Sequence, residues 1–111
     1  MKFGLVRKCR GDAYVVYPMN MLSLDMQRCA KMLENSGMDV TYSEFMLNAN
    51  EHFSEHYTLY RTGRLLISPC PDEKAALIMA KHFYELLSRD GKVARMLSEG
   101  QPLFEGEGLD L

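Results

Sequence analysis

The segment from Tyr57 to Phe83, YTLYRTGRLLISPCPDEKAALIMAKHF, constrains the fold of this chain more than any other. Its first residues alternate as a strand does, Thr62-Gly63 then forms a two-residue turn, and residues 64–68 return as a second strand. Two prolines at 69 and 71 end that strand because proline cannot donate to a strand ladder. Acidic residues at 72 and 73 favour a helix start. The segment therefore predicts a β-hairpin that feeds into an amphipathic helix running to about Ser88.

The N-terminal third predicts a second hairpin and another helix. Residues 3–8 and 13–17 are β-favouring, and Arg10-Gly11-Asp12 separates them as a turn. Helical spacing then places one apolar stripe on residues 21–36, with Ser23 as the expected N-cap and Gly37 as the left-handed residue at the end. The stripe consists of Leu22, Met26, Cys29, Ala30 and Leu33.

Two further segments complete the expected elements. Residues 40–47 have a β-favouring composition whose alternation fails near Glu44, which a β-bulge would explain. Val93, Met96 and Leu97 form a short third amphipathic helix that ends at Gly100.

This order of elements predicts an α+β fold. We expect a two-layer sandwich in which a curved antiparallel sheet of four to five strands carries two main helices on one face, in the order ββαβββα or similar, plus the short C-terminal helix. Residues 1–100 would form a single domain, and the acidic residues 101–111 a flexible tail. One face of the sheet would then remain open.

Composition narrows the environment and the chemistry. The chain has 111 residues and a net charge of -2, and no apolar stretch is long enough for a signal peptide or a membrane span, so we expect a cytoplasmic protein that does not contact membranes. Its three cysteines include no CxxC pair, which argues against a structural zinc site. No phosphate-binding glycine loop or dinucleotide fingerprint is present, and we expect no cofactor.

The run from Tyr57 to Phe83 resembles the hairpin and second helix of one half-repeat of the TATA-box-binding protein family. Thr62-Gly63-Arg64 takes the place of that family's turn, and Tyr60 matches an aromatic residue that wedges between base steps there. The resemblance implies a helix-grip fold and a sheet face that contacts DNA. Only one repeat is present, so a homodimer would be needed to restore the family's saddle, and 68–71 reads Ser-Pro-Cys-Pro where the family usually has Thr-Gly-Ala-Lys.

A cationic and aromatic surface is the first candidate site. Basic residues concentrate at the N-terminus and at the tip of the second predicted hairpin, interleaved with aromatic ones, a composition that can stack bases and hold phosphates. The alternative is a solvated strand edge, on which basic residues oppose aggregation. The candidate binding residues are Phe3, Arg7, Lys8, Arg10, Tyr57, Tyr60, Arg61 and Arg64.

A zinc site is the competing candidate. The segment HFSEH, from His52 to His56, fits the H-x-x-E-H pattern, in which two histidines one helical turn apart bind zinc and Glu55 would activate water. This spacing works only on a helix, whereas the segment lies between two predicted strands. A polar loop is the simpler interpretation.

Two functional hypotheses follow. In the first, the protein is a non-catalytic binding or assembly module whose open sheet face, carrying some of five residues, pairs with a second copy, another protein or nucleic acid. Those residues are Tyr57, Leu59, Tyr60, Leu65 and Ile67. In the second, it is a small zinc-dependent hydrolase that uses His52, Glu55 and His56.

Overall fold

The computed structural model of the chain describes residues 3–8, 11–50, 56–98 and 101–102. These residues form an open sheet of six strands in the order β1-β2-β7-β6-β5-β4, with every neighbouring pair antiparallel. The strands are β1 (Phe3–Lys8), β2 (Tyr14–Pro18), β4 (Asp39–Tyr42), β5 (Met46–Asn50), β6 (His56–Tyr60) and β7 (Leu65–Ser68). The helices in the described ranges are α1 (Met26–Asn35), α2 (Glu73–Leu87) and α3 (Gly91–Ser98).

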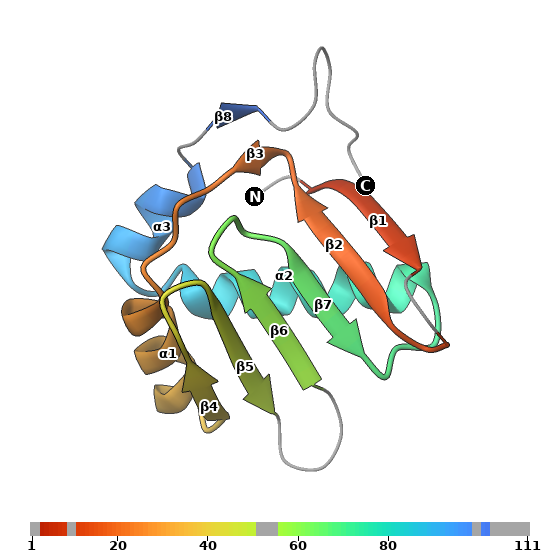
Figure 1. Cartoon of the computed structure of the whole chain (residues 1–111), viewed down its shortest axis with the longest axis horizontal. Helices are drawn as coiled ribbons and strands as arrows, with labels where there is room; N and C mark the ends of the chain where they lie inside the picture. The colour runs from red at the N-terminus through yellow and green to blue at the C-terminus, as the bar shows by residue number, and fades with distance from the viewer. Residues whose placement is uncertain (1–2, 9–10, 51–55, 99–100, 103–111) are drawn as a thin grey trace.

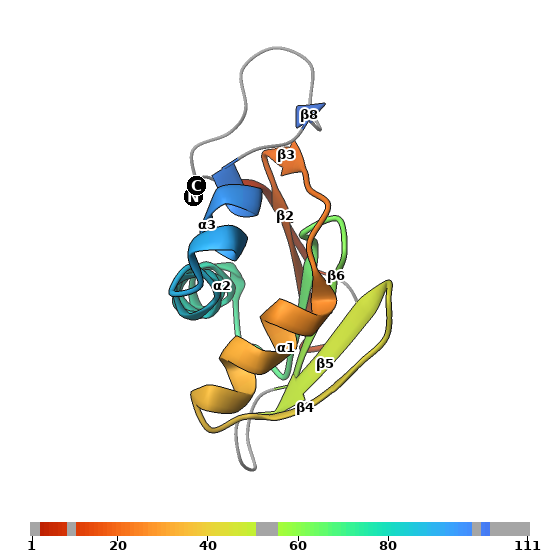
Figure 2. The same ribbon diagram turned by 90° about the vertical axis from the view of Figure 1, so that its left-hand side faces the viewer.

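The helices pack on one face of the sheet. In Figure 1 the strands lie in front of α2, and in Figure 2, turned by 90°, the helices lie on one side of the layer of strands. The α+β class, the antiparallel sheet and the one-sided helices were therefore predicted correctly. The expected number of strands, four to five, was too small.

The additional strand comes from the segment predicted to carry a β-bulge. Residues 39–50 form a complete hairpin, β4 and β5, with a turn over Ser43, Glu44 and Phe45. The backbone N–H of Ser43 donates to the carbonyl of Met46 at 2.8 Å and closes the turn. The alternation fails near Glu44 because the chain reverses there, so the bulge was the wrong explanation.

Helix α1 begins later than the apolar stripe suggested. Asp25, not Ser23, is the N-cap, and its carboxylate accepts hydrogen bonds from the backbone N–H groups of Gln27 and Arg28 at 3.0 and 3.3 Å. Leu22 and Leu24 are buried but lie before the helix, and their N–H groups donate to carbonyls of the β6–β7 turn. Because alternate extended residues also share a face, Leu22 satisfied the helical pattern by coincidence.

The β6–β7 hairpin and α2 lie where predicted, but the turn is a three-residue loop, Arg61 to Gly63, rather than the expected two residues. Gly63 adopts a φ of 98°, and its N–H donates to the carbonyl of Tyr60 at 2.8 Å. Asp72 caps α2 by accepting from the N–H of Ala75 at 2.8 Å. Gly37 has a φ of 97°, as expected for the residue after α1.

The core lies between the helices and the sheet. Phe83 of α2 is fully buried and stacks on Tyr57 of β6, with their ring centroids 4.8 Å apart. Cys29 and Cys70 are buried in the same cluster. Burial raises the pKa of the Cys29 thiol to about 12, helped by the charges of Asp25 and Asp90, so this cysteine remains a protonated core residue at neutral pH.

The described C-terminal region follows the prediction in α3 but not in the first two residues of the tail. Helix α3 covers the residues expected for the short third helix. Gln101-Pro102 forms β8, which pairs with β3 (Asn20–Met21), whereas the rest of the tail expected to be flexible lies outside the described residues. No helix in the described ranges is both long and apolar enough to cross a bilayer.

Candidate binding face

The alternation of side chains along the strands separates two faces of the sheet. On β6, Tyr57 and Leu59 are buried beneath the helices, whereas Thr58 and Tyr60 point to the opposite side. Residues paired across neighbouring strands share a face, so the register of the strands extends this assignment over the whole sheet. We call the side without helices the open face; it is turned toward the viewer in Figure 1.

The register arranges the open face in three rows that cross the strands. The first row contains Arg64, Tyr60 and Met46, and continuing the β2–β7 pairing by one residue beyond Val16 and Leu65 places Tyr17 beside Arg64. The second runs Arg7, Val15, Leu66, Thr58, Asn48 and Thr41, and the third runs Ser68, His56, Asn50 and Asp39. Apolar and aromatic residues thus gather over β2, β7 and β6, and polar residues over β5 and β4.

Arg64 and Tyr60 form the centre of the first row. The guanidinium carbon of Arg64 lies 4.1 Å from the centroid of the Tyr60 ring, within the range of a cation–π contact. The backbone joins the same two residues, since the N–H of Tyr60 donates to the carbonyl of Arg64 at 2.9 Å. Both side chains are half-buried. The arginine therefore lies over the ring of one tyrosine, beside the strand position of a second, Tyr17.

The charge on the open face is opposite in sign to that of the chain. Arg7 and Arg64 lie among its apolar residues, and Asp39 is the acidic side chain that the rows place there, at the far edge on β4. The whole chain carries a net charge of -2. The two arginines give the apolar half of the open face a local positive charge that would attract an anionic ligand.

Three of the predicted binding residues meet on this face, namely Arg7, Tyr60 and Arg64. Lys8 pairs with Tyr14 and therefore lies on the helix side of the sheet, not on the open face. Phe3 lies at the start of β1, but its side chain, like the whole of Arg10, lies outside the described residues.

Arg61 lies off the open face and is engaged elsewhere. Its guanidinium is 3.8 Å from the carboxylate of Glu44 and 3.3 Å from the hydroxyl of Ser23. These contacts tie the β4–β5 turn and the segment before α1 to the end of β6. The predicted hairpin-tip pair of arginines is thus divided between two environments.

Placing Tyr57 on the open face was wrong. Its side chain is 3% exposed and stacks on Phe83 under α2. Leu59, Leu65 and Ile67 are fully buried on the same side. Of the five residues from which the open face was expected to draw some members, only Tyr60 lies there, because Tyr57 and Tyr60 point to opposite faces of β6.

The residues that the prediction missed lie on β2, β7 and β5. Tyr17 and Val15 on β2, Leu66 on β7 and Met46 on β5 complete the apolar half of the open face. The sequence offered one signal for them. Of the two sets of alternate residues on these strands, the set with Tyr57, Leu59, Leu65 and Ile67 is the more apolar, and core packing buries the more apolar set. The other set then had to face outward.

The structure does not form the zinc motif into a helix at its described end. His56 is the first residue of β6 and is exposed on the open face. His52 and Glu55 lie outside the described residues. Across the ranges that the structure describes, no three His, Cys, Asp or Glu side chains gather closely enough to hold a metal ion.

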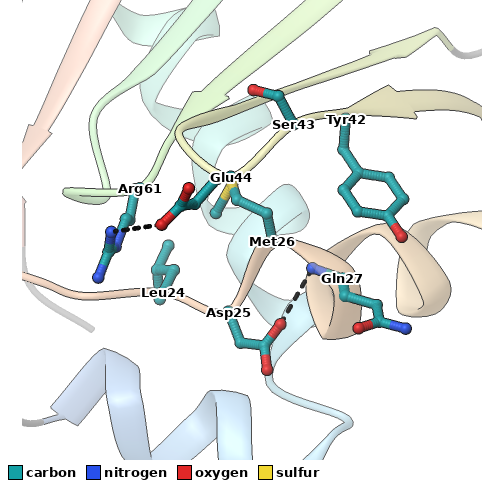
Figure 3. Close-up of a pocket in the computed structure, with 8 residues that line it drawn as sticks. All are labelled: Leu24, Asp25, Met26, Gln27, Tyr42, Ser43, Glu44 and Arg61. Carbon is teal, nitrogen blue, oxygen red and sulfur yellow. Dashed lines mark hydrogen bonds and ion pairs between the residues drawn. The ribbon is translucent and has the colours of Figure 1, made fainter.

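A pocket of about 280 Å³ lies between the start of α1 and the β4–β5 turn. Figure 3 shows that two of its polar groups have partners: the Asp25 carboxylate caps α1, and Glu44 faces Arg61. Tyr42 also lines the pocket. The first contact lies within the start of α1 and the second joins the β4–β5 turn to the end of β6, and we assign the pocket no ligand.

Comparison of the chain with family models, with curated proteins and with solved structures found no match. The candidate face is therefore argued from its own residues.

Proposed function

We propose that the protein is a non-catalytic binding module and that its open face binds single-stranded nucleic acid. The observation that carries the proposal is the first row, in which Arg64 lies over Tyr60 and next to Tyr17 in the register of the sheet. Aromatic rings and guanidinium planes on a sheet are surfaces on which bases stack, with little dependence on sequence.

The surrounding residues suit such a ligand. Arg7, at the β1 end of the second row, provides a second positive charge for the backbone phosphates. On the other side, Thr58 and Asn48 bring a hydroxyl and an amide to the surface, already joined to each other at 2.8 Å. These groups can exchange hydrogen bonds with base edges.

The same charges argue against a face-to-face dimer as the occupant. A two-fold stack of two open faces would bring the arginines of the apolar half toward those of the second copy, and burying like charges close together is unfavourable. A flexible polyanion instead neutralises them. Because two arginines of the described part of the chain lie on the open face, we expect weak binding, with log K falling against log salt with a slope of roughly -1.4.

Titration of the full chain with labelled single-stranded oligonucleotides of mixed sequence, followed by fluorescence anisotropy at low salt, tests the proposal. Tyr60→Ala should weaken binding by about 5- to 150-fold, the range expected for the loss of one stacked base. Tyr60→Phe should retain most of the affinity because the ring remains. Arg64→Ala should also reduce the salt slope by about 0.7.

Tyr42→Ala is the matched control. Tyr42 is 49% exposed but lies on the helix side of β4, not on the open face. Its removal should therefore leave the affinity for the oligonucleotide unchanged. Absence of binding by the wild-type chain at low salt, or equal losses for Tyr42→Ala and Tyr60→Ala, would refute the proposal. Tighter binding to duplex DNA would also contradict it, since paired bases do not expose their faces for stacking.

A further inference from the structure

The edge of the sheet at β4 has features that the open face does not explain. β4 is the last strand in the order, so a second strand can still be added beside it. Two of the large hydrophobic residues that the described surface leaves exposed lie here: Tyr42, 49% exposed, and Phe45, 65% exposed, in the adjoining turn. An open edge with exposed aromatic residues is a template for strand addition.

The backbone of β4 shows which groups point outward. The N–H of Ser43 donates to Met46 on β5, and in an antiparallel ladder the groups of alternate residues point to the same side. Thr41 and Asp39 therefore also face β5. The N–H and C=O groups of Val40 and Tyr42 face away from the sheet.

We propose that β4 pairs with β4 of a second copy of this chain, antiparallel and about a two-fold axis at Thr41. In this register the outward N–H and C=O groups of Val40 in each copy bond to those of Tyr42 in the other copy. All outward backbone groups of the strand are then paired. Both residues lie on the helix side, where a β-branched residue opposite an aromatic one is a favourable cross-strand pair. On the open-face side Thr41 meets Thr41, and Asp39 meets Ser43 rather than another acid.

The alternative axis, at Val40, is less favourable. It would place Tyr42 opposite Met38, whose N–H already donates to the carbonyl of Leu33 at 3.1 Å. One carbonyl of Tyr42 in each copy would then lack its donor. An axis midway between two residues is excluded, because it would oppose side chains from different faces of the sheet.

A second copy is the occupant that these features favour. The edge is self-complementary in hydrogen bonding, its aromatic residue meets a β-branched one, and its single acid is not opposed by its symmetry mate. The strand has only four residues, so the contact alone is smaller than that of a permanent dimer. We therefore expect association that depends on protein concentration.

Disulfide trapping in the full chain tests the register. In a Cys9→Ser background the remaining cysteines, Cys29 and Cys70, are buried. Thr41→Cys would place two thiols on the axis within disulfide range and should give at least about tenfold more covalent dimer under mild oxidation than Asp39→Cys. In the Asp39→Cys control the cysteine lies on the same face of β4, but the two cysteines of the dimer would be roughly 13 Å apart along the strand.

Sedimentation of chains without introduced cysteines tests the backbone pairing. Val40→Pro removes an outward N–H without affecting the β5 ladder and should abolish the dimer, whereas Val40→Ala keeps the N–H and should retain it. Equal disulfide yields at 41 and 39, or a dimer that survives Val40→Pro, would overturn the proposal in favour of another surface. A strictly monomeric chain without preferential trapping at 41 would overturn it as well and would leave the edge to a different protein. Oligonucleotide binding by the open face is measured separately and does not depend on this outcome.

Discussion

The hydroxyl of Tyr84 donates a hydrogen bond to the carbonyl of Gly63, which joins α2 to the β6–β7 turn across the buried side of the sheet. Tyr84 is 2% exposed, and burial, followed by the nearby Cys29, raises its pKa, so the hydroxyl remains protonated and available as a donor. The turn is also held by Leu22, whose N–H donates to Thr62 at 3.0 Å. The end of the hairpin that carries Tyr60 and Arg64 is thus fixed from behind.

Tyr84→Phe should lower the free energy of unfolding by about 1–3 kcal/mol, because the buried carbonyl of Gly63 loses its donor while the ring is retained. Urea denaturation followed by circular dichroism measures the change. Tyr42→Phe, at an exposed tyrosine, should change stability by less than about 0.5 kcal/mol. Similar small effects in both variants would show that the hydroxyl contributes little.

Gly63→Ala should destabilise the protein more than Gly37→Ala. The two glycines have nearly the same positive φ, 98° at Gly63 and 97° at Gly37. Each substitution therefore incurs the strain of placing a side chain on a residue with positive φ, of order 1–3 kcal/mol. A Cβ at Gly63 would also lie 2.7 Å from Cδ1 of Leu22, whereas one at Gly37 would have no atom within 4 Å. The difference between the two unfolding free energies isolates this clash, and equal values would exclude it.

Tyr57→Ala and Tyr60→Ala should have opposite consequences. Tyr57 is buried against Phe83, so its truncation should reduce the free energy of unfolding by about 3–5 kcal/mol. Tyr60 lies on the open face, and its truncation should leave the fold intact while weakening oligonucleotide binding. Thermal denaturation of the two variants, beside the anisotropy titration, separates the two roles. Unfolding of the Tyr60→Ala chain would show that the open face is part of the core.

Asp90 should make stability depend on pH in acid. Its carboxylate accepts hydrogen bonds from the N–H groups of Val93 and Lys92, and Arg28 lies 3.6 Å away; these contacts lower the pKa of Asp90 below 3.8. Because the folded pKa is depressed, the stabilisation is present at neutral pH and is lost as the pH falls through it.

Asp90→Asn retains the capping oxygen but cannot titrate. Its unfolding midpoint in urea should therefore fall less steeply than that of the wild type below about pH 4. Parallel profiles for the two proteins would show that other carboxylates determine the acid sensitivity.

The elements with strong local signals were predictable, whereas their assembly was less so. The positive φ at Gly63, the end of β7 before the prolines and the stripe of α2 each have a local physical cause, and the structure confirmed them, although the turn is one residue longer than predicted. The start of α1 was wrong because Leu22 fits both a helical and an extended pattern. Phe45, 65% exposed, made the β4–β5 turn resemble an interrupted strand.

The candidate face required information that no single strand contains. Which alternate residues of β6 are buried depends on the face of the sheet that α2 covers. The expected proximity of Tyr17 to Arg64 depends on the pairing of β2 with β7. Those two strands are separated in sequence by α1 and four strands. Charge and aromatic content identified Arg7, Tyr60 and Arg64, but only the register brought them together with Tyr17.

The position of β2 between β1 and β7 also bears on how the chain reaches its native state. Strands β4 to β7 are successive hairpins that can zip together locally, whereas β2 must find β7 across about fifty residues of intervening chain, an entropic cost that grows with the length of the closed loop. We therefore expect the N-terminal hairpin to dock late. The first row of the candidate face, which spans that junction, would be completed only in this last step.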